Sequence, residues 1–400
     1  MKPHQLNIPV KTYFGRDIWK ESLKEVEPLL DGNIMIVTTG RSLTRLGYVE
    51  KLKEQLSACT LAKTITVFDK VSANPRLSEA QEGIRLARER GVDVVVGFGG
   101  GSAIDMAKAV AAGTDVCADI EACFYDGKTP MGHVLPIIAI PTTAGTGSEL
   151  SKAAILTDEV RRIKSGIRGA KLYPKAAIVD SVFTESVPFR ITMETGFDVF
   201  AHAMESYVSK AASPFTQMQS EYAARIVGEM LPRLAFDMQD KDARKHMSYA
   251  SMIMGINLGN SSTGLPHRLQ YPLGAATDMS HGAGLAALYP AWVYYEYPHS
   301  EKMTEKMIGS LVGKDIRGRE ECTSAMYAFI TSLNLPASLQ DFNIKEEQMD
   351  DMAMAVSGNI FNDPAAQEPD ILKKIYHKAW EGQECRQSLW QQEKAADSEA

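Results

Sequence analysis

Residues 92–102 read VDVVVGFGGGS, and this stretch decides the fold of the first half of the chain. Its apolar, β-branched start has the composition of a buried strand in a parallel sheet. The glycines end that strand and open a helix that is expected to run through Asp105 and Lys108. Glycines at such a turn let backbone N–H groups approach a pyrophosphate, whose negative charge the helix N-terminus favours. Glycine clusters also occur in ordinary turns, but a strand, a turn and a helix in this order favour a nucleotide site.

Segments on both sides of this stretch repeat the alternation of strand and helix. Helices are expected at 19–30 and 78–90. This rhythm predicts a parallel sheet with crossover helices, whose ligand lies beyond the carboxyl ends of the strands. The sequence therefore predicts a Rossmann-like α/β dinucleotide-binding domain over residues 1–185, with further strands at 10–14, 33–38, 64–68, 137–140 and 176–180.

The second half of the chain has a different composition. It is rich in Met and Ala and has few β-branched runs. The pattern predicts an all-α domain over 186–400, in which the Met residues fill the core. The candidate ligands and the resemblance given below imply that it is the metal-binding and catalytic domain. A polar tail is expected from 383 to 400, and helical periodicity is found in 191–210, 214–239, 241–259, 280–297, 302–313, 319–334 and 345–357.

Charge and composition exclude several classes of protein. The net charge of -7 and the absence of a basic stripe argue against a nucleic-acid partner. The 5 cysteines are scattered and form no C-x-x-C pair, which fits free thiols in a reducing compartment. No signal-peptide core and no long apolar run is present. We therefore expect a cytoplasmic protein without a membrane partner.

Candidate metal ligands occur in the second half. Residues 196–205 read GFDVFAHAME, and on a helix Asp198 and His202 lie on one face, one turn apart. Such a pair can hold a metal ion, although it is more often a surface hydrogen bond. His267 and His281 supply two further ligands. One Asp and three His leave room for the open position that a catalytic metal needs.

At these residues the chain resembles the iron-containing (group III) alcohol dehydrogenase family. The family pattern is G-[LF]-D-x-x-x-H-x-x-E, followed by G-x-x-H and by a further His fourteen residues after that one. Asp198, His202, His267 and His281 match it, and the resemblance extends from about residue 10 to 380. It implies a metal-dependent, NAD(P)-linked alcohol dehydrogenase or aldehyde reductase that forms a dimer. Carboxylate and imidazole ligands suit either Fe2+ or Zn2+.

The resemblance also implies the nucleotide-binding residues. The family's G-G-G-S-x-x-D-x-x-K, N-P and P-T-T-A-G-T-G-S-E patterns are all matched. Asn74 could instead belong to a simple turn, and Lys164, which matches a family lysine that contacts the nucleotide, could instead be solvated. The residues assigned to the cofactor in this way are Gly99, Gly100, Gly101, Ser102, Asp105, Asn74, Thr142, Thr143, Thr146 and Lys164.

The end of the second strand bears on the choice between NADH and NADPH. Relatives that are strict for NAD carry an Asp there, which bonds the ribose hydroxyl and repels a 2′-phosphate. Here Thr39, Gly40, Arg41 and Ser42 offer no acid, one guanidinium and two hydroxyls. We therefore predict that NADPH is accepted and preferred, unless Arg41 points to solvent.

Three residues bear on the substrate. Tyr271 stands where many relatives carry a further His, and it could donate a proton or merely shape the pocket. Arg268 directly follows a ligand, and Lys152 lies three residues past Glu149. Two cations would suit an aldehyde with an anionic group, such as phosphonoacetaldehyde or sulfoacetaldehyde. Alternatively, Arg268 pairs with a helix carboxylate at the domain interface and Lys152 is solvated. The enzyme would then act on neutral alcohols or diols, or the chain would be a non-catalytic nucleotide-binding relative.

Overall fold

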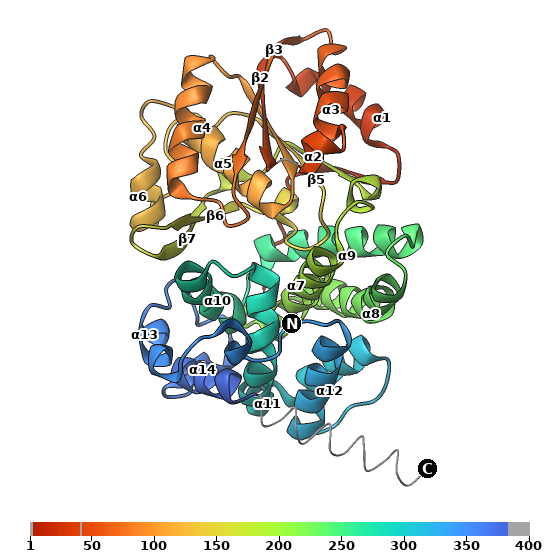
Figure 1. The fold of residues 1–400 in the computed structure, drawn as a ribbon, viewed down its shortest axis with the longest axis vertical. Helices are drawn as coiled ribbons and strands as arrows, with labels where there is room; N and C mark the ends of the chain where they lie inside the picture. Colours follow the sequence, from red (N-terminus) through yellow and green to blue (C-terminus); the bar gives the residue numbers. More distant parts are fainter. Residues whose placement is uncertain (1–2, 41, 383–400) are drawn as a thin grey trace. The chain divides into compact units, whose positions relative to one another are not determined.

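The structure is a computed structural model that describes residues 3–40 and 42–382 (Figure 1). The described residues form two compact units. One comprises residues 5–188 and 239–259, and the other is formed mainly by 189–238 and 260–382. Arg41 and the polar tail expected at 383–400 lie outside the described residues. The division into domains at residue 185 stays a prediction.

The first unit contains a six-stranded parallel sheet with the strand order β1-β8-β5-β4-β2-β3. From the central pair β2 and β4 the chain proceeds in opposite directions, to β3 on one side and to β5 on the other. Ligands of such sheets bind at this point of reversal, beyond the strands' carboxyl ends. All six strands were predicted, and their bounds are β1 Lys11–Gly15, β2 Gly32–Thr39, β3 Ala62–Val71, β4 Val94–Gly99, β5 Ile137–Pro141 and β8 Ala176–Asp180.

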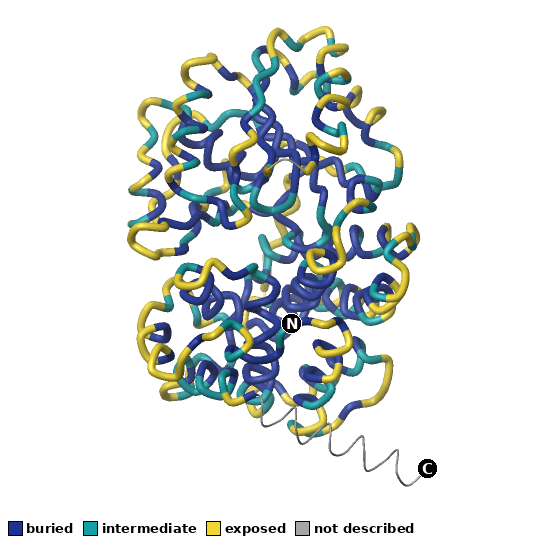
Figure 2. Tube along the Cα trace, in the orientation of Figure 1, coloured by how far each residue is buried: buried dark blue, intermediate teal, exposed yellow. Residues whose placement is uncertain are grey.

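The four inner strands of this sheet, β2, β4, β5 and β8, are largely buried, whereas the edge strands β1 and β3 are more exposed (Figure 2). Along β2, Ile34 and Ile36 enter a core with α1 and α3, whereas Met35 and Val37 enter a second core with α4 and α5. A strand buried on both faces needs a continuous apolar run, which is why these strands could be found in the sequence. The helices are α1 Trp19–Glu25, α2 Ser42–Arg45, α3 Tyr48–Ser57, α4 Leu77–Glu89, α5 Gly101–Gly113 and α6 Ile120–Tyr125.

An antiparallel hairpin, β6 (Ala153–Asp158) and β7 (Ile163–Arg168), was not predicted. It follows a short 3-10 helix, η2 (Ser148–Leu150), and places Lys164 on β7. The hairpin forms its own two-stranded sheet, separate from the parallel one. The apolar part of β6 is only four residues long, and β7 mixes polar and apolar residues, so the pattern of the hairpin is weak in the sequence.

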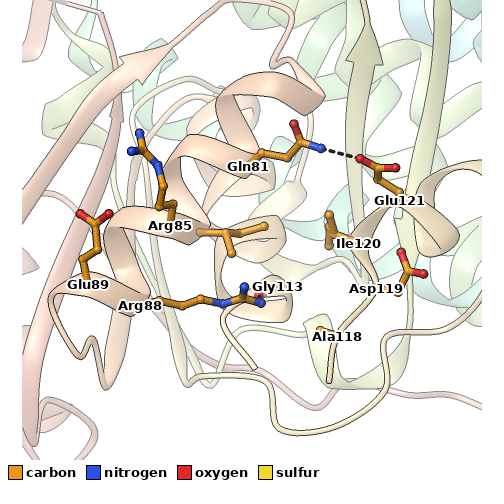
Figure 3. A pocket seen from close by; sticks show the side chains of 10 residues that line it. Gln81, Arg85, Arg88, Glu89, Gly113, Ala118, Asp119, Ile120 and Glu121 are labelled. Carbon is orange, nitrogen blue, oxygen red and sulfur yellow. Dashed lines mark hydrogen bonds between the residues drawn. The ribbon is translucent and has the colours of Figure 1, made fainter. Parts of the chain in front are cut away.

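Helices α4 and α6 border a surface pocket (Figure 3). Gln81 of α4 donates a hydrogen bond of 2.7 Å to Glu121 of α6. Arg88 donates to the carbonyl of Gly113 at 2.6 Å, and so satisfies an end carbonyl of α5 that has no partner within the helix. In the described part of the chain no predicted site residue lines this pocket.

Helix α9 (Lys241–Asn260) was expected among the helices of the second half, yet it belongs to the α/β unit. Arg244 of this helix donates to the carbonyl of Val187 at 3.1 Å. Ser251 accepts the N–H of Gly145 at 2.8 Å, which ties the helix to the loop after β5. Sequence order therefore does not assign α9 to its unit.

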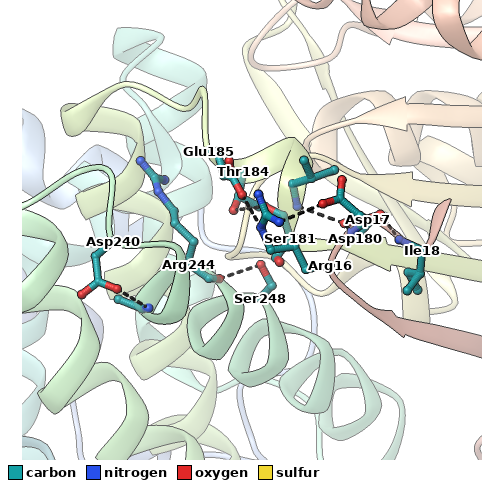
Figure 4. A network of polar contacts seen from close by, with 12 residues as sticks. Arg16, Asp17, Ile18, Asp180, Ser181, Thr184, Glu185, Asp240, Arg244 and Ser248 are labelled. Atoms are coloured by element: carbon teal, nitrogen blue, oxygen red, sulfur yellow. Dashed lines mark hydrogen bonds and ion pairs between the residues drawn. The ribbon is translucent and has the colours of Figure 1, made fainter.

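A polar network stabilises the same unit at the end of β8 (Figure 4). The Asp180 carboxylate accepts N–H groups of Asp17, Ile18 and Trp19 at 2.7–2.9 Å, and thus holds the start of α1. Arg16 pairs with Glu185 at 2.8 Å beside it. A carboxylate at a helix N-terminus satisfies donors that have no partner within the helix.

The second unit is helical, which confirms the predicted all-α organisation. The two expected helices at 280–297 and 302–313 form one element, α11, interrupted by non-helical geometry at Ser300. Helices α10 and α14 were not predicted. Its helices are α7 Phe189–Val208, α8 Pro214–Phe236, α10 Leu265–Thr277, α11 His281–Val312, α12 Arg319–Ser332, α13 Met349–Met354 and α14 Ile371–Glu381.

Two prolines explain why α10 was not predicted from the sequence. Pro266 lies in the first turn, where the missing N–H costs nothing. Pro272 lies in the interior, where a proline usually breaks a helix. None of the described helices has both the length and the apolarity that crossing a membrane requires.

Candidate metal centre and nucleotide site

The four predicted metal ligands come together in the helical unit. Helix α7 carries Asp198 and His202, α10 carries His267, and α11 begins at His281. The Nε2 atoms of His267, His202 and His281 lie 3.4, 3.8 and 3.8 Å from Asp198 Oδ1. Three imidazoles from three helices thus converge on one carboxylate oxygen.

The donor atoms fit a metal ion. Asp198 Oδ1 and His267 Nε2 are buried and have no hydrogen-bond partner among the described residues. Leaving such atoms buried without a partner is costly. Ligands of a tetrahedral ion at 2.0–2.1 Å are about 3.3–3.5 Å apart, close to the spacing found here. The ligand atoms of Asp198, His267 and His281 all lie within 4.8 Å of one another, and His202 stacks on His267 with ring centroids 4.5 Å apart.

Two residues that the sequence analysis did not assign orient the imidazoles. His267 Nδ1 donates to Glu205 Oε1 at 2.7 Å, and His281 Nδ1 donates to Gln270 Oε1 at 2.6 Å. Each bond directs the Nε2 lone pair towards Asp198, as in other metal sites where an outer partner fixes the histidine. The signal for Glu205 was present, because it lies seven residues after Asp198 and thus two helical turns along the same face.

The electrostatics of the site follow from this packing. Burial lowers the pKa of His267, but Glu205 and then Asp198 outweigh burial and raise it to about 10. Burial raises the pKa of Asp198, but His202 and the other imidazoles outweigh it and leave that pKa below its usual value. The carboxylate is therefore ionised, and the position between it and His267 attracts a cation. Metal binding there displaces a proton from His267.

Arg268 and Tyr271 follow the ligand on α10. Both side chains are buried, and the Arg268 guanidinium lies 5.6 Å from the centroid of the Tyr271 ring. Among the described residues of the helical unit, its buried Nε has no hydrogen-bond partner and no carboxylate pairs with the guanidinium. Gly358 covers the guanidinium, since a Cβ at this glycine would lie 3.5 Å from Nη1. Within the helical unit no described carboxylate pairs with Arg268, and the alternative of a helix carboxylate at the domain interface stays a prediction.

The glycine turn lies at the carboxyl ends of the central strands, as predicted. Gly101 approaches the loop after β5 so closely that a Cβ would lie 2.6 Å from Thr146 Oγ1. Thr143 lies against Gly100, and the N–H of Thr142 donates to the carbonyl of Gly99 at 2.9 Å. The two loops that were assigned to the cofactor are therefore adjacent.

The remaining cofactor residues are distributed around this turn. Lys164 is buried and donates to Asn74 Oδ1 at 3.0 Å, so it is not the solvated lysine of the alternative. Ser102 donates to the carbonyl of Ala73, next to Asn74. Asp105 accepts the N–H of Ile155 at 2.9 Å and the hydroxyl of Ser148, so its contacts here are within the protein.

The residues assigned to the 2′-position lie at the end of β2. Thr39 is the last residue of that strand and lies near Gly99, Gly40 has a φ of 51°, and Ser42 begins α2. Arg41 is outside the described residues. Lys152 is exposed and lies between η2 and β6 in the α/β unit.

Comparison with known proteins gives a consistent result over both halves. The profile described as "Iron-containing alcohol dehydrogenase" matches residues 9–181, and the profile of the C-terminal part of the Fe-containing alcohol dehydrogenase family matches residues 192–380.

Individual relatives differ in what they act on. The NAD-dependent methanol dehydrogenase of Bacillus methanolicus is 29% identical and covers 90% of this chain and 94% of its own. The choline dehydrogenase of Bacillus subtilis is 30% identical, with 94% of each chain covered. The crystal structure of sulfoacetaldehyde reductase from Bifidobacterium kashiwanohense in complex with NAD+ has a TM-score of 0.84 at 28% identity, with 95% and 99% covered.

Proposed function

The chain belongs to the iron-containing alcohol dehydrogenase family, and within that family we propose that it reduces a small aldehyde bearing an anionic group. It is an NAD(P)-dependent oxidoreductase of this family. Phosphonoacetaldehyde and sulfoacetaldehyde are the substrates to test first. The proposed reaction converts the aldehyde, NAD(P)H and a proton into the alcohol and NAD(P)+.

The observation that carries this proposal is the state of Arg268. A buried guanidinium without a carboxylate partner costs several kcal/mol of free energy. An anionic group on the substrate would offset that cost, and a guanidinium can hold a phosphonate or sulfonate through two parallel hydrogen bonds. Arg268 directly follows the proposed ligand His267 on α10.

The similarity to known relatives does not by itself choose a substrate. Methanol dehydrogenase, choline dehydrogenase and sulfoacetaldehyde reductase are all 28–30% identical to this chain. A cationic substrate such as choline would be repelled by an unpaired guanidinium, and methanol would leave it without a partner. Arg268 therefore favours a substrate like that of the sulfoacetaldehyde reductase over methanol or choline.

We propose the following roles for the residues of the site. When bound, the ion supplies Lewis acidity to an aldehyde or alcohol oxygen, and the nicotinamide supplies or accepts the hydride. Asp198, His202, His267 and His281 would hold an Fe2+ or Zn2+ ion. Arg268 would bind the anionic group, with the Tyr271 ring supporting the guanidinium. Tyr271→Phe distinguishes that support from proton donation, because only donation needs the hydroxyl.

The proposal is tested with Arg268→Ala on matched substrates. Losing a buried charged contact costs about 2–5 kcal/mol, so kcat/KM for the anionic aldehyde should fall roughly 30-fold or more. The value for propanal should change far less. Arg225→Ala is the matched control, because Arg225 also lies over a tyrosine ring, that of Tyr222, but is exposed. Equal losses on both substrates would show that Arg268 is structural and that neutral alcohols or diols are the substrates.

Two further parts of the proposal concern cations outside the metal centre. We propose that Arg41 reads the 2′-phosphate of NADPH and that exposed Lys152 adds to the attraction of an anionic substrate. Arg41→Ala should then lower the ratio of kcat/KM for NADPH to that for NADH by about 10-fold, the size expected for one charge-assisted hydrogen bond. An unchanged ratio would mean that Arg41 does not contact the cofactor.

We also propose that the protein forms a dimer, and light scattering can measure its mass in solution.

A further inference from the structure

The amino end of α10 is held by side chains from other elements. The four N–H groups at a helix N-terminus have no partner within the helix, and an N-cap side chain usually satisfies one of them. Here the N-cap is Gly264, which has no side chain, and Pro266 has no N–H. Instead, Glu205 Oε2 accepts the N–H of Gly264 at 2.6 Å, and Asp363 Oδ2 accepts that of Leu265 at 2.8 Å.

Asp363 connects three segments of the helical unit. Its Oδ2 also accepts the indole N–H of Trp292 on α11 at 3.1 Å. Its Oδ1 accepts the N–H of Ala365 at 3.0 Å, at the start of the 3-10 helix η7 (Pro364–Gln367). The side chain is 1% exposed, so these donors replace water completely. A buried carboxylate that accepts several N–H groups fixes the positions of all of them.

A second acid accompanies Asp363 but does not contact α10 in the same way. Glu296 Oε2 accepts the same N–H of Ala365 at 3.0 Å. Burial raises the pKa of Glu296, and the nearby Asp363 carboxylate raises it further, so Glu296 is the member of the pair that holds a proton. This leaves the negative charge on Asp363, facing the positive end of the α10 dipole.

We infer that Asp363 is a positioning residue for the metal centre: it fixes the first turn of α10 and thereby the direction in which His267 presents Nε2. His267 is the third residue of that helix, two positions after Leu265. Asp363 packs closely against the start of α10, since a Cβ on Gly264 would lie 2.5 Å from Asp363 Oδ2. The inference rests on the proposed metal centre and not on the anionic substrate.

The same segment contacts α10 at a second point. Gly358, five residues before Asp363, has a φ of 87° and lies against the Arg268 guanidinium. Residues 358–363 therefore follow α10 from its amino end to the arginine. The segment thus contacts the helix both before and after His267.

The test measures metal affinity and backbone exchange as well as turnover. Metal-free full-length variants are titrated with Zn2+ in competition with a chromophoric chelator. Asp363→Ala should weaken Zn2+ binding about 10–100-fold, as outer partners of metal ligands do. Asp363→Asn keeps one oxygen acceptor for Leu265 and Trp292 and should recover most of that loss. Hydrogen exchange of peptides spanning 261–270 should accelerate in Asp363→Ala even without Zn2+.

Glu296→Gln is the matched control, because it alters the same buried cluster without removing a partner of α10. It should keep wild-type Zn2+ affinity and wild-type exchange at 261–270. The inference is overturned if folded Asp363→Ala binds Zn2+ with wild-type affinity, or if Glu296→Gln loses as much affinity as Asp363→Ala. Failure of the anionic aldehyde as a substrate would leave these Zn2+ titrations unaffected, so the two proposals fail separately.

Discussion

Each unit of this protein buries a cation, and the two cations have opposite surroundings. In the α/β unit Lys108 is fully buried, and its Nζ donates to the carbonyls of Ser148 and Ala153 and to the hydroxyls of Ser148 and Ser151 at 2.7–3.0 Å. Arg268 of the helical unit is also buried, but among the described residues of that unit it has neither a carboxylate partner nor a partner for its Nε.

The difference separates a structural charge from a functional one. Lys108 has every proton of its ammonium group in use, so it holds the loop at η2 and has no capacity left for a ligand. Buried polar atoms without hydrogen-bond partners are found in Arg268, Asp198 and His267. Such atoms cost free energy unless a ligand binds to them. Unsatisfied buried atoms therefore mark the proposed site more clearly than buried charge does.

The largest expected effect concerns the proposed metal centre, where buried polar atoms lack hydrogen-bond partners. Asp198→Ala should lower kcat by about 1,000-fold or more, because it removes the oxygen on which the three imidazoles converge and with it several kcal/mol of transition-state stabilisation. Steady-state assays with added Zn2+ or Fe2+ measure this, and circular dichroism checks that the variant is folded. Full activity of wild-type protein stripped of metal would contradict the prediction.

Replacing Lys108, whose ammonium protons are all hydrogen-bonded, should change the stability of the protein. Lys108→Met should lower the free energy of unfolding by about 3–5 kcal/mol, since it removes the cation that lies 3.7 Å from the Asp105 carboxylate and leaves the carbonyls of Ser148 and Ala153 without this donor. Urea titration followed by circular dichroism measures the change. Lys24→Met, at an exposed lysine, is the control and should change stability by less than about 0.5 kcal/mol. A loss no larger than that of the control would show that Lys108 does not hold the loop.

The acid near Lys108 should make stability depend on pH. Burial raises the pKa of Glu149 to about 7, against the lowering effect of Lys108. Between its unfolded value of 4.5 and this folded value the folded state binds more protons than the unfolded state. Stability contributed by protonated Glu149 is thus complete below pH 4.5 and is lost as pH rises to about 7. The loss should be about 2–4 kcal/mol.

Glu149→Gln isolates this contribution. Urea titrations of wild type and variant at several pH values between 4.5 and 7.5 give the difference in unfolding free energy. That difference should change with pH over this range in the direction stated. A difference that is constant with pH would show that Glu149 has an ordinary pKa.

The smallest expected change is in the stability of an Arg268 variant. Arg268→Met keeps an apolar stem and removes a buried charge that has no carboxylate partner, so the protein should be as stable as wild type or more stable, within about 1 kcal/mol. Urea titration beside Lys108→Met makes the comparison direct. A loss as large as that of Lys108→Met would reveal a partner for Arg268 and remove the distinction between the two cations.

The sequence was sufficient for those features that depend on neighbours in the chain. All six strands of the parallel sheet were identified, and continuous apolar runs mark the four inner ones, β2, β4, β5 and β8, because these are buried on both faces. The spacing of Asp198 and His202 placed both on one face of α7, because a helix fixes that geometry. The glycine turn was predicted from its place between a strand and a helix.

Features that depend on distant segments required the tertiary structure. The helix α10 forms despite Pro272, and its amino end is completed by Glu205 and Asp363, which lie far from it in sequence. Lys164 is buried against Asn74, and α9 packs in the α/β unit. Periodicity in the sequence shows that one face of an element is apolar, but it does not show which other element that face packs against. Whether Arg268 has a carboxylate partner also depends on which elements surround it. A sequence determines which polar atoms exist, whereas only the packing of distant elements decides which of them are satisfied and which remain for a ligand.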